Sequence, residues 1–143
     1  MAAYRKLLVL LDLSDDSDQV VIAARDLAAL TQAGIVALHV VEFVPVEPMG
    51  ESLMPTVQIE DELIVRSRDK LGALAARLGL TGATLRVEAG NTKSEILRVA
   101  QDEGVDLIVV GSRERHGLAI LVNFTEETIL HYARCDVLAV RLK

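Results

Sequence analysis

Short apolar runs alternate with longer amphipathic stretches along the whole chain. Four of the runs are nearly continuous in Val, Leu, Ile and Ala, which predicts buried strands, and a fifth alternates between apolar and polar residues, as an edge strand does. The predicted strands are 7–11, 35–41, 84–89 (the alternating one), 105–110 and 137–142. Between them, apolar residues recur every three or four positions, the spacing of a helix that buries one face.

The first two helices are predicted from their ends as well as from their spacing. The acidic and hydroxyl residues of 12–17 suit a helix N-terminus, and Gly34 is expected as the C-terminal cap. A second helix begins at Val57 and ends at Gly79. Its predicted buried face consists of Leu63, Leu71, Leu74, Ala75 and Leu78.

Two further helices follow the same logic. Asn91 or Thr92 is expected to cap a helix that Gly104 follows, and Asn123 stands three residues before Glu126, the spacing of a capping box. Five strands alternating with four helices predict an α/β fold, with a parallel sheet covered by helices on both faces, in one domain over 1–143. The proline-containing loop 44–56 is long enough to form a lid or a disordered excursion.

Composition excludes several classes of protein. The 143 residues are 51% apolar with only two Tyr, two Phe and no Trp, which is unlike a disordered tail or a collagen-like chain. Fifteen basic against 21 acidic residues give a net charge of −6, which disfavours nucleic acid as a partner. The longest apolar runs are too short for a signal sequence or a membrane span, so we expect a cytoplasmic protein without a membrane partner. The one cysteine, Cys135, fits a reducing compartment and is either a small core residue or a reactive thiol.

A candidate site follows from the predicted topology. Parallel sheets bind ligands beyond the carboxyl ends of their strands, where the winding direction reverses. If the first strand is central, residues 12–14 and 111–117 line this crevice, with main chain near Val40 and Val41. Asp12 there either caps a helix or faces a ligand. The basic cluster of 113–116 either holds an anion or forms a solvated surface loop around Glu114.

No residue pattern demands catalysis. His39, His116 and His131 are scattered without the spacing of metal ligands, and Ser14 lacks the surroundings of a nucleophilic serine. We therefore expect no catalytic residues and no metal site.

Several segments together resemble the universal stress protein family over essentially the whole chain. The most specific is 106–113, and the others are 10–14, 96–97, Arg115, 117–118, Ala133, Cys135 and 137–138. The resemblance implies a Rossmann-like open parallel five-stranded sheet of order 3-2-1-4-5, a homodimer, and a cytoplasmic role in stress resistance.

The resemblance also bears on ATP. Family members that bind ATP resemble Gly-x-x-Gly, nine residues, then Gly-Ser or Gly-Thr. Gly111 matches the first glycine, but Glu114 stands at the second and Phe124 or Asn123 at the third. Those glycines let main-chain amides approach phosphate oxygens, and a glutamate adds repulsion of about 4 kcal/mol per charge pair at about 4 Å and an effective dielectric of about 20. This pattern is more similar to the A branch of the family, which lacks ATP binding.

The sequence thus favours a non-catalytic, homodimeric stress-response module without a tightly bound cofactor, acting through a protein partner or an unidentified ligand. The alternative is a nucleotide-dependent switch that binds ATP with magnesium, with slow hydrolysis or autophosphorylation. Its expected binding residues are Asp12, Val40, Gly111, Ser112, Arg113 and Thr125.

The last predicted strand carries the expected dimer contact. Val137, Leu138, Ala139 and Val140 form an apolar edge that invites pairing with another chain. Pairing with its two-fold mate would form an isologous dimer. The alternative is an edge that a helix of the same chain covers.

Overall fold

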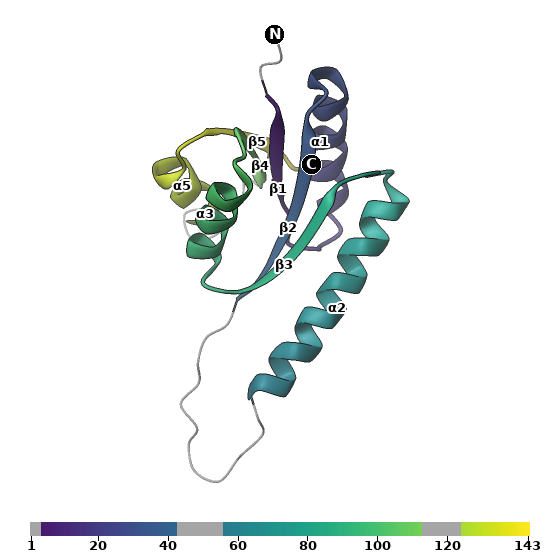
Figure 1. The fold of residues 1–143 in the computed structure, drawn as a ribbon, viewed down its shortest axis with the longest axis vertical. Coiled ribbons are helices and arrows are strands. Elements are labelled where there is room, and N and C mark those ends of the chain that lie inside the picture. Colours follow the sequence, from purple (N-terminus) through teal and green to yellow (C-terminus); the bar gives the residue numbers. More distant parts are fainter. Residues whose placement is uncertain (1–3, 43–55, 113–123) are drawn as a thin grey trace.

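A computed structural model describes residues 4–42, 56–112 and 124–143, which form a twisted five-stranded parallel sheet with helices on both sides (Figure 1). The strand order is β3-β2-β1-β4-β5, so the expected Rossmann-like α/β topology is confirmed. The elements are β1 (Lys6–Leu10), α1 (Ser17–Thr31), β2 (Gly34–Glu42), α2 (Thr56–Arg77), β3 (Thr84–Gly90), α3 (Thr92–Glu103), β4 (Leu107–Ser112), α5 (Phe124–Tyr132) and β5 (Asp136–Arg141).

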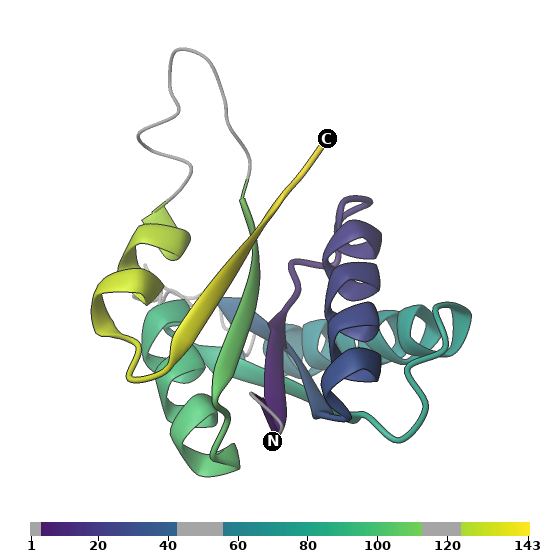
Figure 2. The same cartoon turned by 90° about the horizontal axis from the view of Figure 1, so that it is seen from above.

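Alternate side chains of the central strands supply two separate cores. Leu7 and Val9 of β1 face α1 and α2, whereas Leu8 and Leu10 face α3 and α5. The two helix pairs therefore lie on opposite faces of the sheet, as Figures 1 and 2 show. Because β1, β2 and β4 bury both faces, their sequences are continuously apolar, and each fully buried aliphatic side chain contributes about 1.5–3 kcal/mol.

The cap of α1 lies two residues before Gly34, the glycine predicted to hold that position. Gln32 is the cap, with a left-handed φ of 58°, and Gly34 begins β2, where its N–H donates to the Arg5 carbonyl at 2.9 Å. The prediction failed because glycine is only the easiest residue to place in the left-handed region. Gln32 adopts this left-handed conformation because β2 begins only two residues later, at Gly34.

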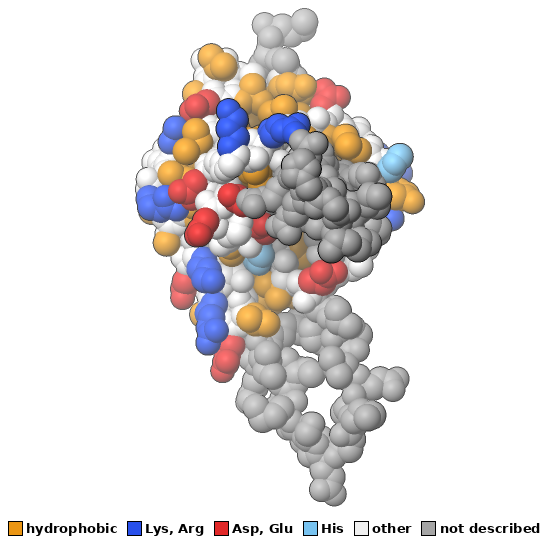
Figure 3. Space-filling view, turned by 180° about the vertical axis from the view of Figure 1, so that it is seen from behind, with side chains coloured by type: hydrophobic (Ala, Val, Ile, Leu, Met, Phe, Trp, Pro, Cys, Tyr) orange, Lys and Arg blue, Asp and Glu red, His pale blue; other side chains and the backbone are white. Residues whose placement is uncertain are grey.

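The predicted buried face of α2 is confirmed at Leu71, Leu74, Ala75 and Leu78 and wrong only at Leu63. Leu63 is 43% exposed, while Ile64 packs against the core, so the buried stripe passes through Ile64, Ser67, Leu71 and Leu74. The prediction was wrong at Leu63 because the neighbouring Ile64, and not Leu63, lies on the side of the helix that packs against the core. The N-terminal part of the helix projects beyond the sheet (Figure 1). Seen from behind, acidic and basic side chains are interspersed along this projecting part (Figure 3).

Strands β1, β4 and β5 are displaced by one or two residues from the predicted ranges, and Asp106 shows why at β4. Its carboxylate accepts the N–H groups of Arg5 at 2.9 Å and Lys6 at 3.1 Å, so it closes the end of the sheet instead of standing within a buried strand. The predicted strand at 105–110 accordingly begins at Leu107.

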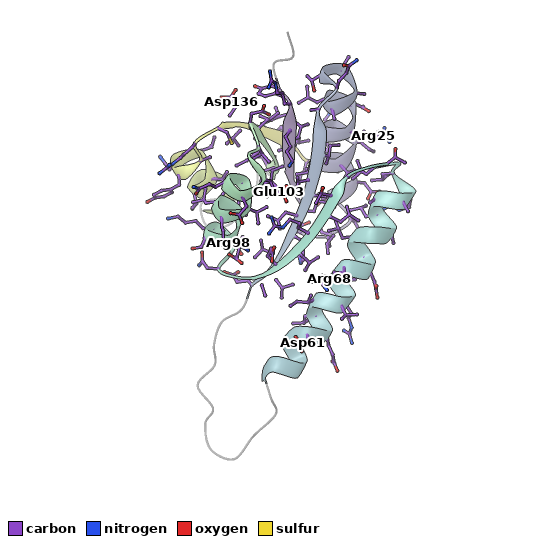
Figure 4. All side chains as sticks on the ribbon, in the orientation of Figure 1. Arg25, Asp61, Arg68, Arg98, Glu103 and Asp136 are labelled. Carbon is purple, nitrogen blue, oxygen red and sulfur yellow. The ribbon has the colours of Figure 1, made fainter. Side chains whose placement is uncertain are left out.

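Helix α3 is tied down at both ends. The Asn91 side chain accepts the Ser94 N–H at 3.0 Å, and Gly104 is a left-handed cap, which confirms both predicted ends. Along its length, Glu103 bridges Lys6 of β1 (2.9 Å) and Arg86 of β3 (3.2 Å), and Arg98 pairs with Glu95 (2.9 Å). Figure 4 shows Arg98 and Glu103 on this helix, beside the sheet.

Two predictions concern residues that the structure does not describe. One is the proline loop 44–56, of which only the last residue, the first of α2, is described, and the other is the Asn123 cap. Within the described residues, no helix is long and apolar enough to cross a membrane.

Candidate functional site

A cavity of about 320 Å³ opens at the carboxyl ends of β1, β2 and β4, at the point where the winding direction of the sheet reverses. This is the position that the topology predicts for a ligand site in a parallel sheet. Apolar side chains from both cores form its floor, and polar side chains form its rim. The described lining consists of Leu10, Leu11, Asp12, Asp16, Ser17, Val20, Leu38, His39, Val40, Glu42, Thr92, Ile96, Val110, Gly111 and Leu142.

Asp12 closes the turn between β1 and α1 and also borders the cavity. Its Oδ1 accepts the Ser14 N–H (3.0 Å), the Ser14 hydroxyl (2.7 Å) and the Ser17 hydroxyl (3.1 Å). Of the two alternatives left open for this residue, the capping role is wrong, because Asp16 holds the N-cap position of α1, and Asp12 instead organises the turn and borders the cavity. All three donors reach one carboxylate oxygen, so Oδ2 has no hydrogen-bond donor in the described part of the chain.

The surroundings of Asp12 keep it ionised. Partial burial alone would raise the pKa of this carboxyl group, but the hydrogen bonds from Ser14 and Ser17 outweigh that effect, and its pKa lies below the ordinary aspartate value. Asp12 therefore presents an acceptor to the cavity and requires a donor, such as a hydroxyl, amine or amide N–H, on any ligand that it contacts.

His39 joins the cavity wall to the main chain of β1. Its Nδ1 lies 2.7 Å from the Leu11 carbonyl oxygen, and because a carbonyl can only accept, Nδ1 carries the proton. In the neutral ring Nε2 is then an acceptor. We expected His39 to be structural, and it has that role while also lining the cavity.

The structure brings together three of the six residues expected for nucleotide binding. Asp12, Val40 and Gly111 line the same cavity. Ser112 lies outside this lining, at the end of β4, where its carbonyl accepts the Leu142 N–H at 2.9 Å. Arg113 and the side chain of Thr125 fall outside the described residues, as do Glu114, Arg115 and His116.

Gly111 is closely packed on the side that faces α1. A β-carbon there would lie 3.1 Å from Val20 Cγ2 and 3.2 Å from Leu142 Cδ1. Glycine at this position therefore serves close packing between β4, α1 and the tail after β5, because any larger residue would displace Val20 or Leu142.

The charge of the described lining is uniformly acidic. Asp12, Asp16 and Glu42 contribute carboxylates, and no Lys or Arg occurs among the described lining residues. Lys93 follows the lining residue Thr92, but its ammonium group sits over the Tyr132 ring, 3.5 Å from the ring centroid. This cation–π contact holds Lys93 against α5.

Sequence reasoning missed several lining residues, most notably Asp16, His39, Glu42, Thr92 and Leu142. A usable signal existed for His39 and Glu42, because both flank the expected Val40 at the end of the same strand. Leu142 carried no such signal, since only the tertiary structure brings the tail after β5 back to α1.

Comparisons with known proteins agree with one another. The profile of the universal stress protein family matches residues 3–141. Universal stress protein A homolog 2 of Coxiella burnetii is 36% identical over 144 residues, covering 100% of this chain and 99% of the relative. Universal stress protein A homolog 1 of the same organism is 34% identical, covering 98% of each chain.

Solved structures show the same fold. The universal stress protein UspA from Lactobacillus plantarum superimposes with a TM-score of 0.76 at 24% identity, covering 99% of this chain and 100% of that one. A universal stress protein solved in complex with cAMP gives a TM-score of 0.65 at 24% identity, covering 96% and 97% of the two chains. The strand order, the profile match and the full-length relatives lead to one conclusion: the chain belongs to the universal stress protein family.

Proposed function

We propose that this chain is a non-catalytic stress-response module of the cytoplasm that works without tight ATP binding, as a homodimer, through a protein partner or an unidentified small ligand. The observation that carries the proposal is the acidic cavity. Asp12 and Glu42 place carboxylates where they would repel a polyphosphate, and no Lys or Arg occurs among the described lining residues. Each carboxylate within about 4 Å of a phosphate charge costs about 4 kcal/mol at an effective dielectric of about 20.

The sequence supports the same proposal beyond the described residues. Glu114 and either Phe124 or Asn123 stand where ATP-binding members of the family have glycine. The remaining glycine, Gly111, is packed against Val20 and Leu142 on its α1 side. Neither the residues at the other two glycine positions nor the packing of Gly111 therefore supports a loop whose main-chain amides bind phosphates.

The proposed dimer uses the outer edge of β5. This strand pairs only with β4 among the described strands, and Leu138 on it is 38% exposed. Leu130 and Tyr132 of α5 are also exposed apolar side chains. An unpaired apolar edge is a liability that pairing with a second copy would remove.

The competing function is a nucleotide-dependent switch. The size and position of the cavity favour it, since about 320 Å³ lies within the range of small-molecule sites. One structural relative is a complex with cAMP. On this alternative the chain would bind ATP with magnesium and carry out slow hydrolysis or autophosphorylation.

Calorimetric titration with ATP and magnesium at low salt separates the two functions. We expect no saturable heat below the millimolar range, and micromolar binding would contradict the proposal. Glu42→Gln and Glu114→Gly should each bind ATP more tightly than the natural chain, because each removes a charge that repels phosphate. Glu62→Gln is the matched control, because Glu62 is exposed on α2 and lies outside the cavity lining.

A further inference from the structure

The two residues after β5 fold back against the cavity. The Leu142 N–H donates to the Ser112 carbonyl at 2.9 Å, which continues the β4–β5 pairing by one residue. The Leu142 side chain lines the cavity and contacts the Gly111 region beside Val20. Leu142 and Val20 therefore form the wall between the cavity and the first turns of α1.

Gln19 of α1 holds this tail in place. The Lys143 N–H donates to Gln19 Oε1 at 2.9 Å, and Gln19 Nε2 donates to the Lys143 main-chain oxygen at 3.3 Å. The same Nε2 lies 3.5 Å from Oδ1 of Asp16, which lines the cavity. The Gln19 side-chain amide thus both accepts from and donates to the main chain of Lys143, and it also reaches Asp16 in the cavity lining.

We propose that residues 142–143 form a strap that sets the width of the cavity, with Leu142 as the residue that limits ligand size and Gln19 as its latch. When the latch is closed, Leu142 occupies the space beside Gly111. When it opens, the cavity widens toward α1. Opening would break the two Gln19–Lys143 hydrogen bonds and the Leu142–Ser112 bond at the end of the β4–β5 pairing, and would leave the remaining β4–β5 pairs in place.

The lining indicates which ligands the strap selects. The floor is apolar and the rim carries carboxylate acceptors, so the fitting class is a small molecule with an apolar body and amine or hydroxyl donors. This assignment of ligand class rests on the proposed function, whereas the strap itself rests only on the contacts of Gln19, Leu142 and Lys143.

A single-cysteine reporter tests the latch. Val20→Cys in a Cys135→Ser background places a thiol on the cavity wall beside Leu142, and its rate of alkylation by uncharged iodoacetamide measures how far Leu142 shields that wall under native conditions. Gln19→Ala should raise this rate about tenfold, the factor expected for the loss of one or two net hydrogen bonds. Gln101→Ala, an exposed glutamine on α3, should leave the rate unchanged. Equal rates in the Gln19→Ala and reporter-only chains would overturn the proposal.

The role of Leu142 in limiting size is tested with reagents of two sizes. In the reporter chain, iodoacetamide should react much faster than its bulkier N-phenyl derivative, relative to their rates with a free thiol. Leu142→Ala should abolish this discrimination, whereas Leu30→Ala, at a fully solvated position of α1, should not. Discrimination that persists in Leu142→Ala would show that another residue sets the width.

Hydrogen exchange provides a measurement that does not depend on the buried Val20→Cys change. In the otherwise natural chain, Gln19→Ala should speed exchange of the Leu142 amide without affecting the amides of β1. An unchanged Leu142 amide would overturn the strap. Neither approach involves a nucleotide, so tight ATP binding would contradict the proposed function and leave the strap untouched.

Discussion

At the scale of single residues, the turn after β1 shows how the sequence prepares the rim of the cavity. Leu13 has a φ of 62°, a left-handed conformation that costs a non-glycine residue about 1–2 kcal/mol. The conformation directs the Ser14 N–H back to Asp12 Oδ1, and Leu13 itself packs against the core. Hydrogen bonding and burial together offset the strain, so Asp12 is held at the cavity by a preformed turn.

The pKa of Asp12 provides a test of this turn. Ser17→Ala removes one of the donors that stabilise the ionised carboxylate, so the pKa of Asp12 should rise toward the ordinary aspartate value. Carbon-detected NMR titration of the Asp12 carboxyl group measures the shift. Ser94→Ala is the matched control because its hydroxyl lies on α3. An unchanged Asp12 pKa in Ser17→Ala would contradict the assigned hydrogen bond.

The same carboxyl group affects stability at acid pH. Because its pKa is lower in the folded than in the unfolded chain, ionised Asp12 stabilises the fold above about pH 4, and this contribution disappears as the pH falls through the lower, folded value. Asp12→Asn should therefore show a weaker loss of stability between pH 5 and acid than the natural chain, measured by urea unfolding. Identical pH profiles would contradict this prediction.

At the scale of elements, helix α3 depends on its ends. Its first turn contributes Thr92 to the cavity, and Asn91 holds that turn through the Ser94 N–H. Only Ile96 and Val99 are its fully buried side chains, and Leu97 and Ala100 pack against the core while partly exposed. The helix therefore needs its cap and its ion pairs to β1 and β3 more than a fully packed helix would.

Removing the Asn91 cap of α3 should lower the stability of the protein measurably. Asn91→Ala should lower the free energy of unfolding by about 1 kcal/mol, since the Ser94 N–H loses its acceptor. Asn91→Asp keeps an acceptor and should retain most of that stability. Urea unfolding of both variants beside the natural chain measures the difference. An alanine variant as stable as the natural chain would show that the cap contributes nothing.

At the scale of the whole molecule, the sheet ends in two strands of different character. β3 carries Arg86 and Glu88 in a partly buried ion-pair network with α3. These charged side chains disfavour pairing of the β3 edge with another chain. β5 presents Leu138 and Ala139 at its surface instead. The asymmetry supports a contact between copies at β5 and none at β3.

One substitution on each edge distinguishes them. If copies pair at β5 as proposed, Leu138→Glu should give a monomer in sedimentation velocity, because it would place two like charges across the proposed two-fold axis. Leu85→Glu on β3 is the matched control, since Leu85 is similarly exposed at 41% against 38%. A dimer that survives Leu138→Glu, or one that Leu85→Glu disrupts, would place the interface elsewhere.

Local patterns identified most of this architecture because each strand and helix carries its own signal of apolar spacing. These local patterns failed where the conformation or exposure of a residue depends on the elements around it, as at Gln32 and Leu63. The left-handed cap at Gln32 follows from where β2 must begin, and Leu63 is exposed because Ile64 takes the side of α2 that packs against the core.

The amino-acid sequence by itself determined the α/β class through its periodicity, and short motifs such as 106–113 indicated the family, whose resemblance implied the strand order. Only the tertiary structure decided what lines the crevice. His39 and Glu42 reach it from the end of β2 and Leu142 from the tail after β5, and the acidic character of the cavity appears only when Glu42 is assembled with Asp12 and Asp16. The physical reason is that charge and shape at a site are sums over residues distant in sequence, which no local pattern contains.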